Sequence, residues 1–231
     1  MTDIQPSHIV RSFDEQLGLL TEKIVAMGGY VESVVADSMD ALIRRDEALA
    51  QEVIDRDKRV DAFEEEIDQM AIRLFATRAP MAVDLRTIAM ALKISNSLER
   101  MSDHAKNNAK RLARLGARAS IPHLAILPRM GQTVQSMIKD VLDAYIQRDA
   151  EKALRVWRQD EEVDRFYDSL NRELMTYMLE DSRQIGTCIE MQFIAKNIER
   201  IGDQATNIAE KVHYMVHARG INRPLEESPS R

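Results

Sequence analysis

Four pairs of carboxylates, each spaced four residues apart, are the residues of this sequence whose types and spacing could do chemistry. A spacing of i to i+4 places two side chains on one face of an α-helix, about one turn apart. Two carboxylates repel each other there, and burial of either one without a partner costs far more. Such pairs therefore need a compensating positive charge. The eight candidate metal ligands are Asp57 and Asp61, Glu99 and Asp103, Asp160 and Asp164, and Glu199 and Asp203.

Carboxylate oxygens suit hard divalent cations or iron, so magnesium, manganese, iron and zinc are all candidates. Asp57 interrupts an apolar seam between Val53 and Val60, which indicates that it faces a neighbouring helix. Each half of the chain is then predicted to hold one cluster of four carboxylates. In the alternative interpretation the same pairs lie on solvated helix faces, where Arg100 and Arg200 neutralise the preceding glutamates. Repetition of all four pairs favours the metal interpretation.

Other chemistries have weaker support in the sequence. Glu210 and His213 have the Glu-x-x-His spacing of di-iron bundles, but the matching places of the first half hold Lys110 and Ala113. The sequence contains no glycine-rich phosphate loop, no convincing Ser/His/Asp arrangement and no zinc spacing of Cys and His. We therefore predict no catalytic residues and no enzyme activity, and no cofactor beyond the metal ions.

Charge and cysteine content exclude several other classes of protein. The chain has 32 Lys and Arg against 38 Asp and Glu, without a basic arm, which argues against nucleic-acid binding. The single cysteine, Cys188, excludes an intrachain disulfide framework and is interpreted as a small buried hydrophobe. No window has the roughly 18 apolar residues of a membrane span, and the N-terminal residues lack a signal-peptide core. We therefore expect a cytoplasmic protein.

The elements that must position these carboxylates are helices. Glycine and proline together make up 14 of 231 residues and aromatic residues 5%, which favours long amphipathic helices over strands. The first is predicted to begin at the capping box Ser12-x-x-Glu15 and to continue through Gly28 and Gly29, which mark a kink or a close helix contact. The others are predicted over about 46–75, about 81–115, from 122–128 onward, after Asp149, and over about 183–218.

The chain also repeats itself. Eight of 20 positions match between 45–64 and 148–167, and seven of 19 match between 94–112 and 194–212. The two offsets, 103 and 100, differ by three residues where a loop is expected. An internal duplication explains these matches, so the predicted fold is all-α, with two tandem three-helix bundles. The predicted units are residues 8–118 and 121–218, followed by a disordered tail at 219–231.

The duplicated motif resembles a known family. Residues 98–104 (LERMSDH) and 198–204 (IERIGDQ) are similar to the paired Glu/Asp-xxx-Asp signature of the PhoU family, and the resemblance extends over roughly 8–218. It implies two three-helix bundles that bind metal at both motifs, and an often dimeric regulator without established catalysis. The pair His104 and Gln204 differs between the motifs, which leaves the equivalence of the two clusters open.

The resemblance further implies a role in phosphate homeostasis. Members of this family act at the inner face of the membrane, through protein partners, between the phosphate ABC transporter with its ATPase subunit and a phosphate-sensing histidine kinase. They limit uptake and keep phosphate-starvation genes repressed when phosphate is plentiful. Two alternatives remain: a carboxylate-bridged metalloenzyme, and a purely structural helical protein with solvated carboxylates.

Overall fold

The computed structural model describes residues 6–77, 82–115 and 125–221. Within these ranges the chain forms six α-helices and one short 3₁₀ helix, without any strand, so the predicted all-α fold is confirmed. Residues 116–124, where the first predicted unit ends and the second begins, and most of the predicted tail (222–231) lie outside the described residues. The helices are α1 (Pro6–Arg44), α2 (Glu47–Thr77), α3 (Ala82–Leu115), α4 (Ile126–Gln147), α5 (Ala150–Glu180) and α6 (Ile185–His217), with the 3₁₀ helix at Ser182–Gln184.

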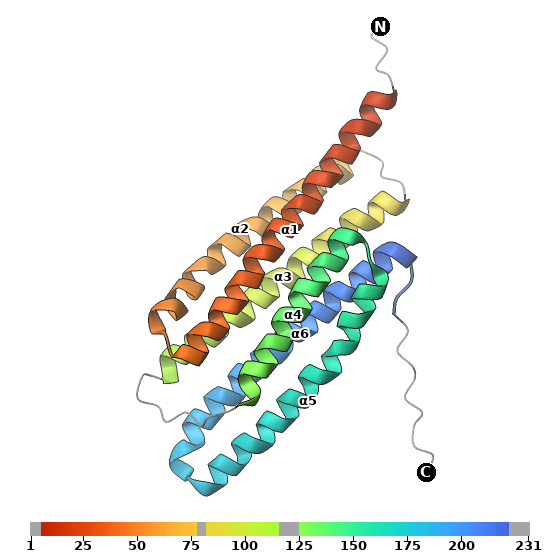
Figure 1. Cartoon of the computed structure of the whole chain (residues 1–231). Helices are drawn as coiled ribbons and strands as arrows, with labels where there is room; N and C mark the ends of the chain where they lie inside the picture. Colours follow the sequence, from red (N-terminus) through yellow and green to blue (C-terminus); the bar gives the residue numbers. More distant parts are fainter. Residues whose placement is uncertain (1–5, 78–81, 116–124, 222–231) are drawn as a thin grey trace, which may run out of the picture.

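Two three-helix bundles lie side by side, with their long axes roughly parallel. Helices α1 to α3 form the first bundle and α4 to α6 form the second, as Figure 1 shows. Helices α2 and α5 form the outer flanks, while α1 contacts α4 and α3 contacts α6 across the middle. The tandem arrangement predicted from the repeat is therefore confirmed. The two acidic segments of each half fall on neighbouring helices, α2 with α3 and α5 with α6.

Helices α2 and α5, the second helix of each bundle, begin with the same kind of N-cap. Asp46 Oδ1 accepts a hydrogen bond from the Leu49 amide at 3.0 Å, and Asp149 Oδ1 accepts one from the Lys152 amide at 2.9 Å. Aspartate is one of the residue types favoured at helix N-caps, because its side chain can accept from a free amide of the first turn. The residue before each, Arg45 and Arg148, lies in the left-handed region with φ of 58° and 51° and ends the preceding helix.

The predicted start of the first helix was wrong. Helix α1 begins at Pro6, so Ser12 lies inside the helix and not at its start. Proline is favoured at a first helical position because its missing N–H would have no partner there. A capping box inside a longer helix looks the same in sequence as one at the helix start. The sequence therefore does not mark where α1 begins.

Close helix contacts at two glycines join the bundles. A Cβ added at Gly28 of α1 would collide with Leu142 of α4, and one added at Gly131 of α4 would collide with Met39 of α1. The offset of 103 relates the two glycines to each other and the two larger residues to each other. The α1–α4 interface is thus symmetric about the duplication. Of the two readings of Gly28, kink or close contact, the structure supports the contact.

Substitution of these glycines gives a matched test of that interface. We expect Gly28→Leu to destabilise the fold by roughly 2 kcal/mol, because it overpacks the contact with Leu142. Gly29→Leu, at an exposed position with nothing within 4 Å of the added Cβ, is expected to stabilise the helix slightly. Urea unfolding of both variants measures the difference. Equal effects of the two substitutions would show that α1 does not approach α4 as described.

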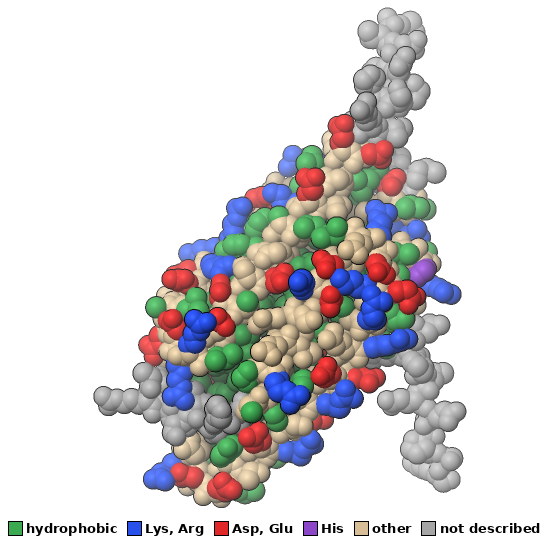
Figure 2. Space-filling view, viewed as in Figure 1, with side chains coloured by type: hydrophobic (Ala, Val, Ile, Leu, Met, Phe, Trp, Pro, Cys, Tyr) green, Lys and Arg blue, Asp and Glu red, His purple; other side chains and the backbone are tan. Residues whose placement is uncertain are grey.

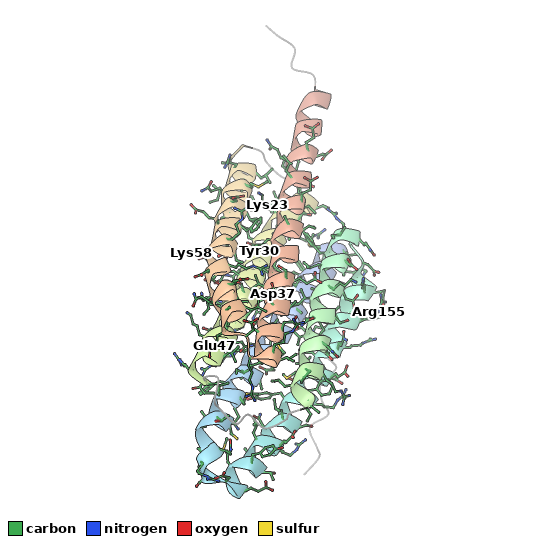
Figure 3. All side chains as sticks on the ribbon, turned by 60° about the vertical axis from the view of Figure 1, so that its left-hand side comes forward. Lys23, Tyr30, Asp37, Glu47, Lys58 and Arg155 are labelled. Atoms are coloured by element: carbon green, nitrogen blue, oxygen red, sulfur yellow. The ribbon has the colours of Figure 1, made fainter. Side chains whose placement is uncertain are left out.

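A polar seam fixes α2 against α1 and so holds the first acidic segment in place. Lys23 Nζ lies 2.6 Å from Glu66 Oε2. Arg56 donates a hydrogen bond to Asp37, and its guanidinium carbon lies 4.9 Å from the Tyr30 ring centroid. Figure 3 shows Lys23, Tyr30 and Asp37 following one another along α1. Because Arg56 directly precedes Asp57, this seam sets the rotation of α2 that directs Asp57 toward α3.

None of the helices in the described part of the chain combines the length and the apolar content that a membrane-spanning helix needs. On the face shown in Figure 2, acidic and basic side chains are interspersed. Mixed charge of this kind is ordinary for an exposed helical surface, so any function has to be sought at more local features.

Candidate functional site

The first acidic cluster lies between α2 and α3. Burial and four neighbouring carboxylates raise the pKa of the Glu99 carboxyl to about 7. In decreasing order of effect those neighbours are Asp103, Glu64, Asp61 and Asp57. The four residues predicted for the first half thus lie in one electrostatic neighbourhood, joined by Glu64 of α2. Because like charges raise this pKa, a bound cation would relieve them.

A lysine occupies part of this cluster. Lys106 Nζ lies 2.5 Å from Asp57 Oδ2 and 2.6 Å from Asp103 Oδ1, and the Ser102 hydroxyl donates to Asp57 Oδ1 at 3.3 Å. Burial alone would lower the pKa of the Lys106 ammonium, but its hydrogen bonds to Asp103 and Asp57 outweigh burial and raise it. The ammonium therefore joins α2 to α3 with the positive charge that the carboxylates require.

The second acidic cluster lies between α5 and α6. Glu199 is only 8% exposed, and its Oε1 accepts a hydrogen bond from Lys196 Nζ at 2.6 Å. Its other oxygen, Oε2, is buried and has no hydrogen-bond partner among the described residues. Burial raises the pKa of Asp203, and the charges of Glu199 and Asp164 raise it further against the opposing effect of Lys196. Asp160 lies one turn before Asp164 on α5.

These carboxylates suit a hard cation in chemistry but do not form a ready-made cage. Within the described residues, no group of three or more His, Cys, Asp or Glu side chains is arranged to hold a metal ion. The orphaned Glu199 Oε2 is the strongest local argument for a ligand, because an unpaired buried carboxylate oxygen is costly. The eight carboxylates therefore stay a prediction as metal ligands. In this structure Lys106 pairs with Asp57 and Asp103, and Lys196 pairs with Glu199.

The match to a known domain falls once on each bundle. The PhoU domain matches residues 24–112 and residues 127–212. The chain belongs to the PhoU family. The two PhoU repeats coincide with α1 to α3 and α4 to α6, so the duplication inferred from internal matches is a duplication of this domain. Both acidic clusters lie inside the matched residues.

Curated relatives resemble the chain over most of their length. The Zymomonas mobilis phosphate-specific transport system accessory protein PhoU homolog is 50% identical over 207 residues, which cover 90% of this chain and 87% of the relative. The Escherichia coli phosphate-specific transport system accessory protein PhoU is 37% identical over 209 residues, with the same two shares.

Solved PhoU structures share the fold. The crystal structure of PhoU from Pseudomonas aeruginosa aligns with a TM-score of 0.87 at 39% identity, over 90% of this chain and all of that one. The phosphate transport system regulatory protein PhoU from Streptococcus pneumoniae aligns with a TM-score of 0.85 at 26% identity, over 91% of this chain and all of that one. The family and its tandem bundles, expected from the two acidic motifs, are thereby confirmed.

Several weaker candidates have structural partners of their own in this PhoU-family chain. Trp157 Nε1 donates to Glu210 Oε1 at 3.3 Å, and His213 Nδ1 lies 3.1 Å from the Arg219 carbonyl oxygen. The Glu-x-x-His pair is therefore engaged in contacts between α5, α6 and the segment after α6. Cys188 is buried as expected, and burial raises the pKa of its thiol, which disfavours a reactive thiolate.

His104, the histidine of the first motif, is half-buried beside positively charged side chains. Burial and the charge of Arg200 lower the pKa of His104, whose Nδ1 is buried without a partner among the described residues. The imidazole is thus held neutral between α3 and α6. Gln204, at the matching place, instead accepts a hydrogen bond from Asn207 at 3.5 Å. The two motifs therefore differ in their immediate surroundings although their carboxylates match.

Sequence reasoning missed three features of the PhoU clusters and their surroundings. Glu64 belongs to the first cluster, but its counterpart at the 103-residue offset is Tyr167, so the repeat gave no signal for it. Lys106 and Lys196 lie at unrelated positions of the two repeats and were likewise invisible to that comparison. A buried amide pair, Asn197 Nδ2 to Asn108 Oδ1 at 2.9 Å, joins α3 to α6.

Proposed function

We propose that this PhoU-family chain regulates phosphate uptake by contact with the phosphate ABC transporter, through its ATPase subunit, and with a phosphate-sensing histidine kinase. In this proposal it acts in the cytoplasm as a homodimer, limits uptake and keeps phosphate-starvation genes repressed when phosphate is plentiful. The observation that carries the proposal is the PhoU match to both bundles, with relatives that are named as phosphate transport accessory proteins over 90% of this chain.

The acidic clusters are proposed to bind metal ions that hold adjacent helices together. Asp57, Asp61, Glu99 and Asp103 would hold one site, and Asp160, Asp164, Glu199 and Asp203 the other. A bound ion supplies positive charge, a part that Lys106 and Lys196 play in this structure. The raised pKa of Glu99 supports this proposal, because burial and neighbouring carboxylates disfavour its ionised form unless a cation is added. Glu199 Oε2 also supports it, because this oxygen is buried without a hydrogen-bond partner among the described residues.

The protein is proposed to work without turnover of its own. A contact regulator needs surfaces that its partners fit. Helices α2 and α5 form the outer flanks of the two bundles (Figure 1), and both carry exposed residues along their length. The strongest enzymatic alternative is a carboxylate-bridged oxidase. The contacts of Glu210 with Trp157 and of His213 with the Arg219 carbonyl disfavour it, since they engage the one Glu-x-x-His pair elsewhere.

A binding experiment tests the proposed contact directly. We expect the purified chain to be retained by the immobilised ATPase subunit of its host's phosphate transporter and released by excess soluble chain. A matched control is the ATPase subunit of an unrelated importer from the same host, because both subunits share the nucleotide-binding fold. If the two ATPase subunits retain equal amounts, or neither retains any, the proposed contact with the transporter is wrong.

A further inference from the structure

A basic groove of about 350 Å³ runs along the α3–α6 interface, beside the second acidic cluster, to which the Lys196–Glu199 ion pair joins it. All of its charged lining side chains are cations, which sets it apart from the mixed surface of Figure 2. Helix α3 contributes three of them and helix α6 two. In chain order they are Lys110, Arg111, Arg114, Lys196 and Arg200.

Within the described ranges, two of these five cations have an ion-pair partner. Arg111 Nη1 lies 2.8 Å from Glu190 Oε2, and Lys196 is bound to Glu199. Among the described residues, Lys110, Arg114 and Arg200 are within ion-pairing distance of no carboxylate. Lys110 and Arg114 moreover repel each other at i to i+4 on α3. The groove thus concentrates unpaired positive charge in a chain whose net charge is −6.

An exposed aromatic ring lies among these cations. Phe193 of α6 is 49% exposed, and the guanidinium carbon of Arg111 lies 4.0 Å from its ring centroid. The groove lining also includes Asn197 of α6, whose side chain donates a hydrogen bond to the buried Asn108 and so joins α6 to α3. A half-exposed ring held by an arginine is the kind of platform on which nucleic-acid bases stack.

The corresponding groove of the other repeat lacks this combination. A second groove at the α3–α6 interface is lined by Lys93, Arg100 and Lys211. At the 100-residue offset, Lys93 stands where Phe193 does, and Glu210 and Tyr214 stand where Lys110 and Arg114 do. The cluster of cations around a ring is therefore not a by-product of the duplicated helix pattern. It is specific to one end of the interface.

We propose that this groove binds a nucleoside di- or triphosphate, with its linked phosphates among the cations and its base on the Phe193 ring. The three unpaired cations match the several negative charges of linked phosphates, and guanidinium groups bind phosphate oxygens in pairs. The groove volume lies within the range of small-molecule sites. A bare phosphate would leave the ring and most of the cations unused.

Isothermal titration calorimetry of the full chain in metal-free buffer tests this inference, with ATP, ADP, tripolyphosphate, inorganic phosphate and adenosine as probes. Without metal ions the acidic clusters cannot recruit the nucleotide through a bridging cation, so the result is independent of the proposed metal binding. We expect ATP and ADP to bind more tightly than tripolyphosphate, and phosphate and adenosine to bind weakest. Affinity is expected to fall as salt increases.

Surface variants localise the binding. Lys110→Gln with Arg114→Gln is expected to weaken ATP binding at least about tenfold. Phe193→Leu is expected to weaken ATP binding but to leave tripolyphosphate binding unchanged. The matched control is Lys58→Gln with Lys139→Gln, which removes the same charge at exposed positions outside the groove; Lys58 lies on the outer helix α2 in Figure 3.

Three results would overturn the inference. In the first, the dissociation constants of ATP and ADP are both about millimolar or weaker, which is too weak for a specific site. In the second, the control variant loses as much affinity as the groove variant, which shows diffuse attraction by surface charge. In the third, tripolyphosphate binds as tightly as ATP and Phe193→Leu has no effect, which assigns the groove to inorganic polyanions instead.

Discussion

Cells that lack this chain are expected to express phosphate-starvation genes in phosphate-rich medium about tenfold above wild-type cells, or more. A regulator of the proposed kind couples the transporter to the kinase, and coupling free energies of about 1–3 kcal/mol change such equilibria roughly 5- to 150-fold. Loss of the chain removes that coupling, so the kinase no longer responds to plentiful phosphate. A fluorescent reporter behind a starvation promoter in the host measures the change.

Two further strains give this experiment its controls. Return of the intact gene is expected to restore repression, which excludes an effect on neighbouring genes. Deletion of the sensor kinase together with this chain is expected to silence the reporter, because the signal is proposed to pass through the kinase. Normal repression in the single deletion strain would refute the regulatory proposal, and measurable turnover by the purified protein would then favour the metalloenzyme.

The fold could be predicted from the sequence because its determinants are local and repeated. Long amphipathic runs with few glycines and prolines predict the six helices, and the capping residues Asp46 and Asp149 mark two of their starts. The start of α1 could not be predicted, since Ser12-x-x-Glu15 has the chemistry of a cap but the helix continues to Pro6. Nor does the sequence distinguish Gly28 from Gly29, since only the first faces α4.

The acidic clusters could be predicted only in part. Asp57, Glu99 and their partners were visible because carboxylates interrupt apolar seams at duplicated positions. Lys106 was not, because its contacts with α2 depend on how α3 is rotated against that helix. The basic groove needs residues about 80 positions apart, such as Arg111 and Phe193, to meet across α3 and α6. No pattern within one helix indicates such a pairing.

Replacement of Asp103 and Asp203 together by Ala is expected to remove most bound metal while the helical fold remains. Each substitution removes a proposed ligand, which should weaken binding by more than the roughly 10- to 100-fold typical of residues that only support a ligand. The fold should persist because the core is built from apolar residues of all six helices. Metal analysis by mass spectrometry and far-ultraviolet circular dichroism measure the two effects.

Asp68→Ala with Asp168→Ala is the matched control for charge, because both aspartates are exposed on the outer helices α2 and α5. The control should keep its metal. Retention of metal by the Asp103 and Asp203 variant would show that these carboxylates are not ligands. Unfolding of the metal-free wild-type protein would contradict the second half of the prediction, since the ions would then be required for folding.

Proton competition should make metal binding at the first cluster depend on pH. The pKa of Glu99 is raised to about 7 by burial and by its carboxylate neighbours, so below that pH a metal ion must displace a proton from this side chain. Affinity should therefore fall as the pH is lowered from about 8 to about 6, a range in which ordinary carboxylates stay ionised. Calorimetry at both pH values measures this fall. An affinity that does not change would mean that Glu99 takes no part in binding, and the first site would then have to rest on the remaining aspartates.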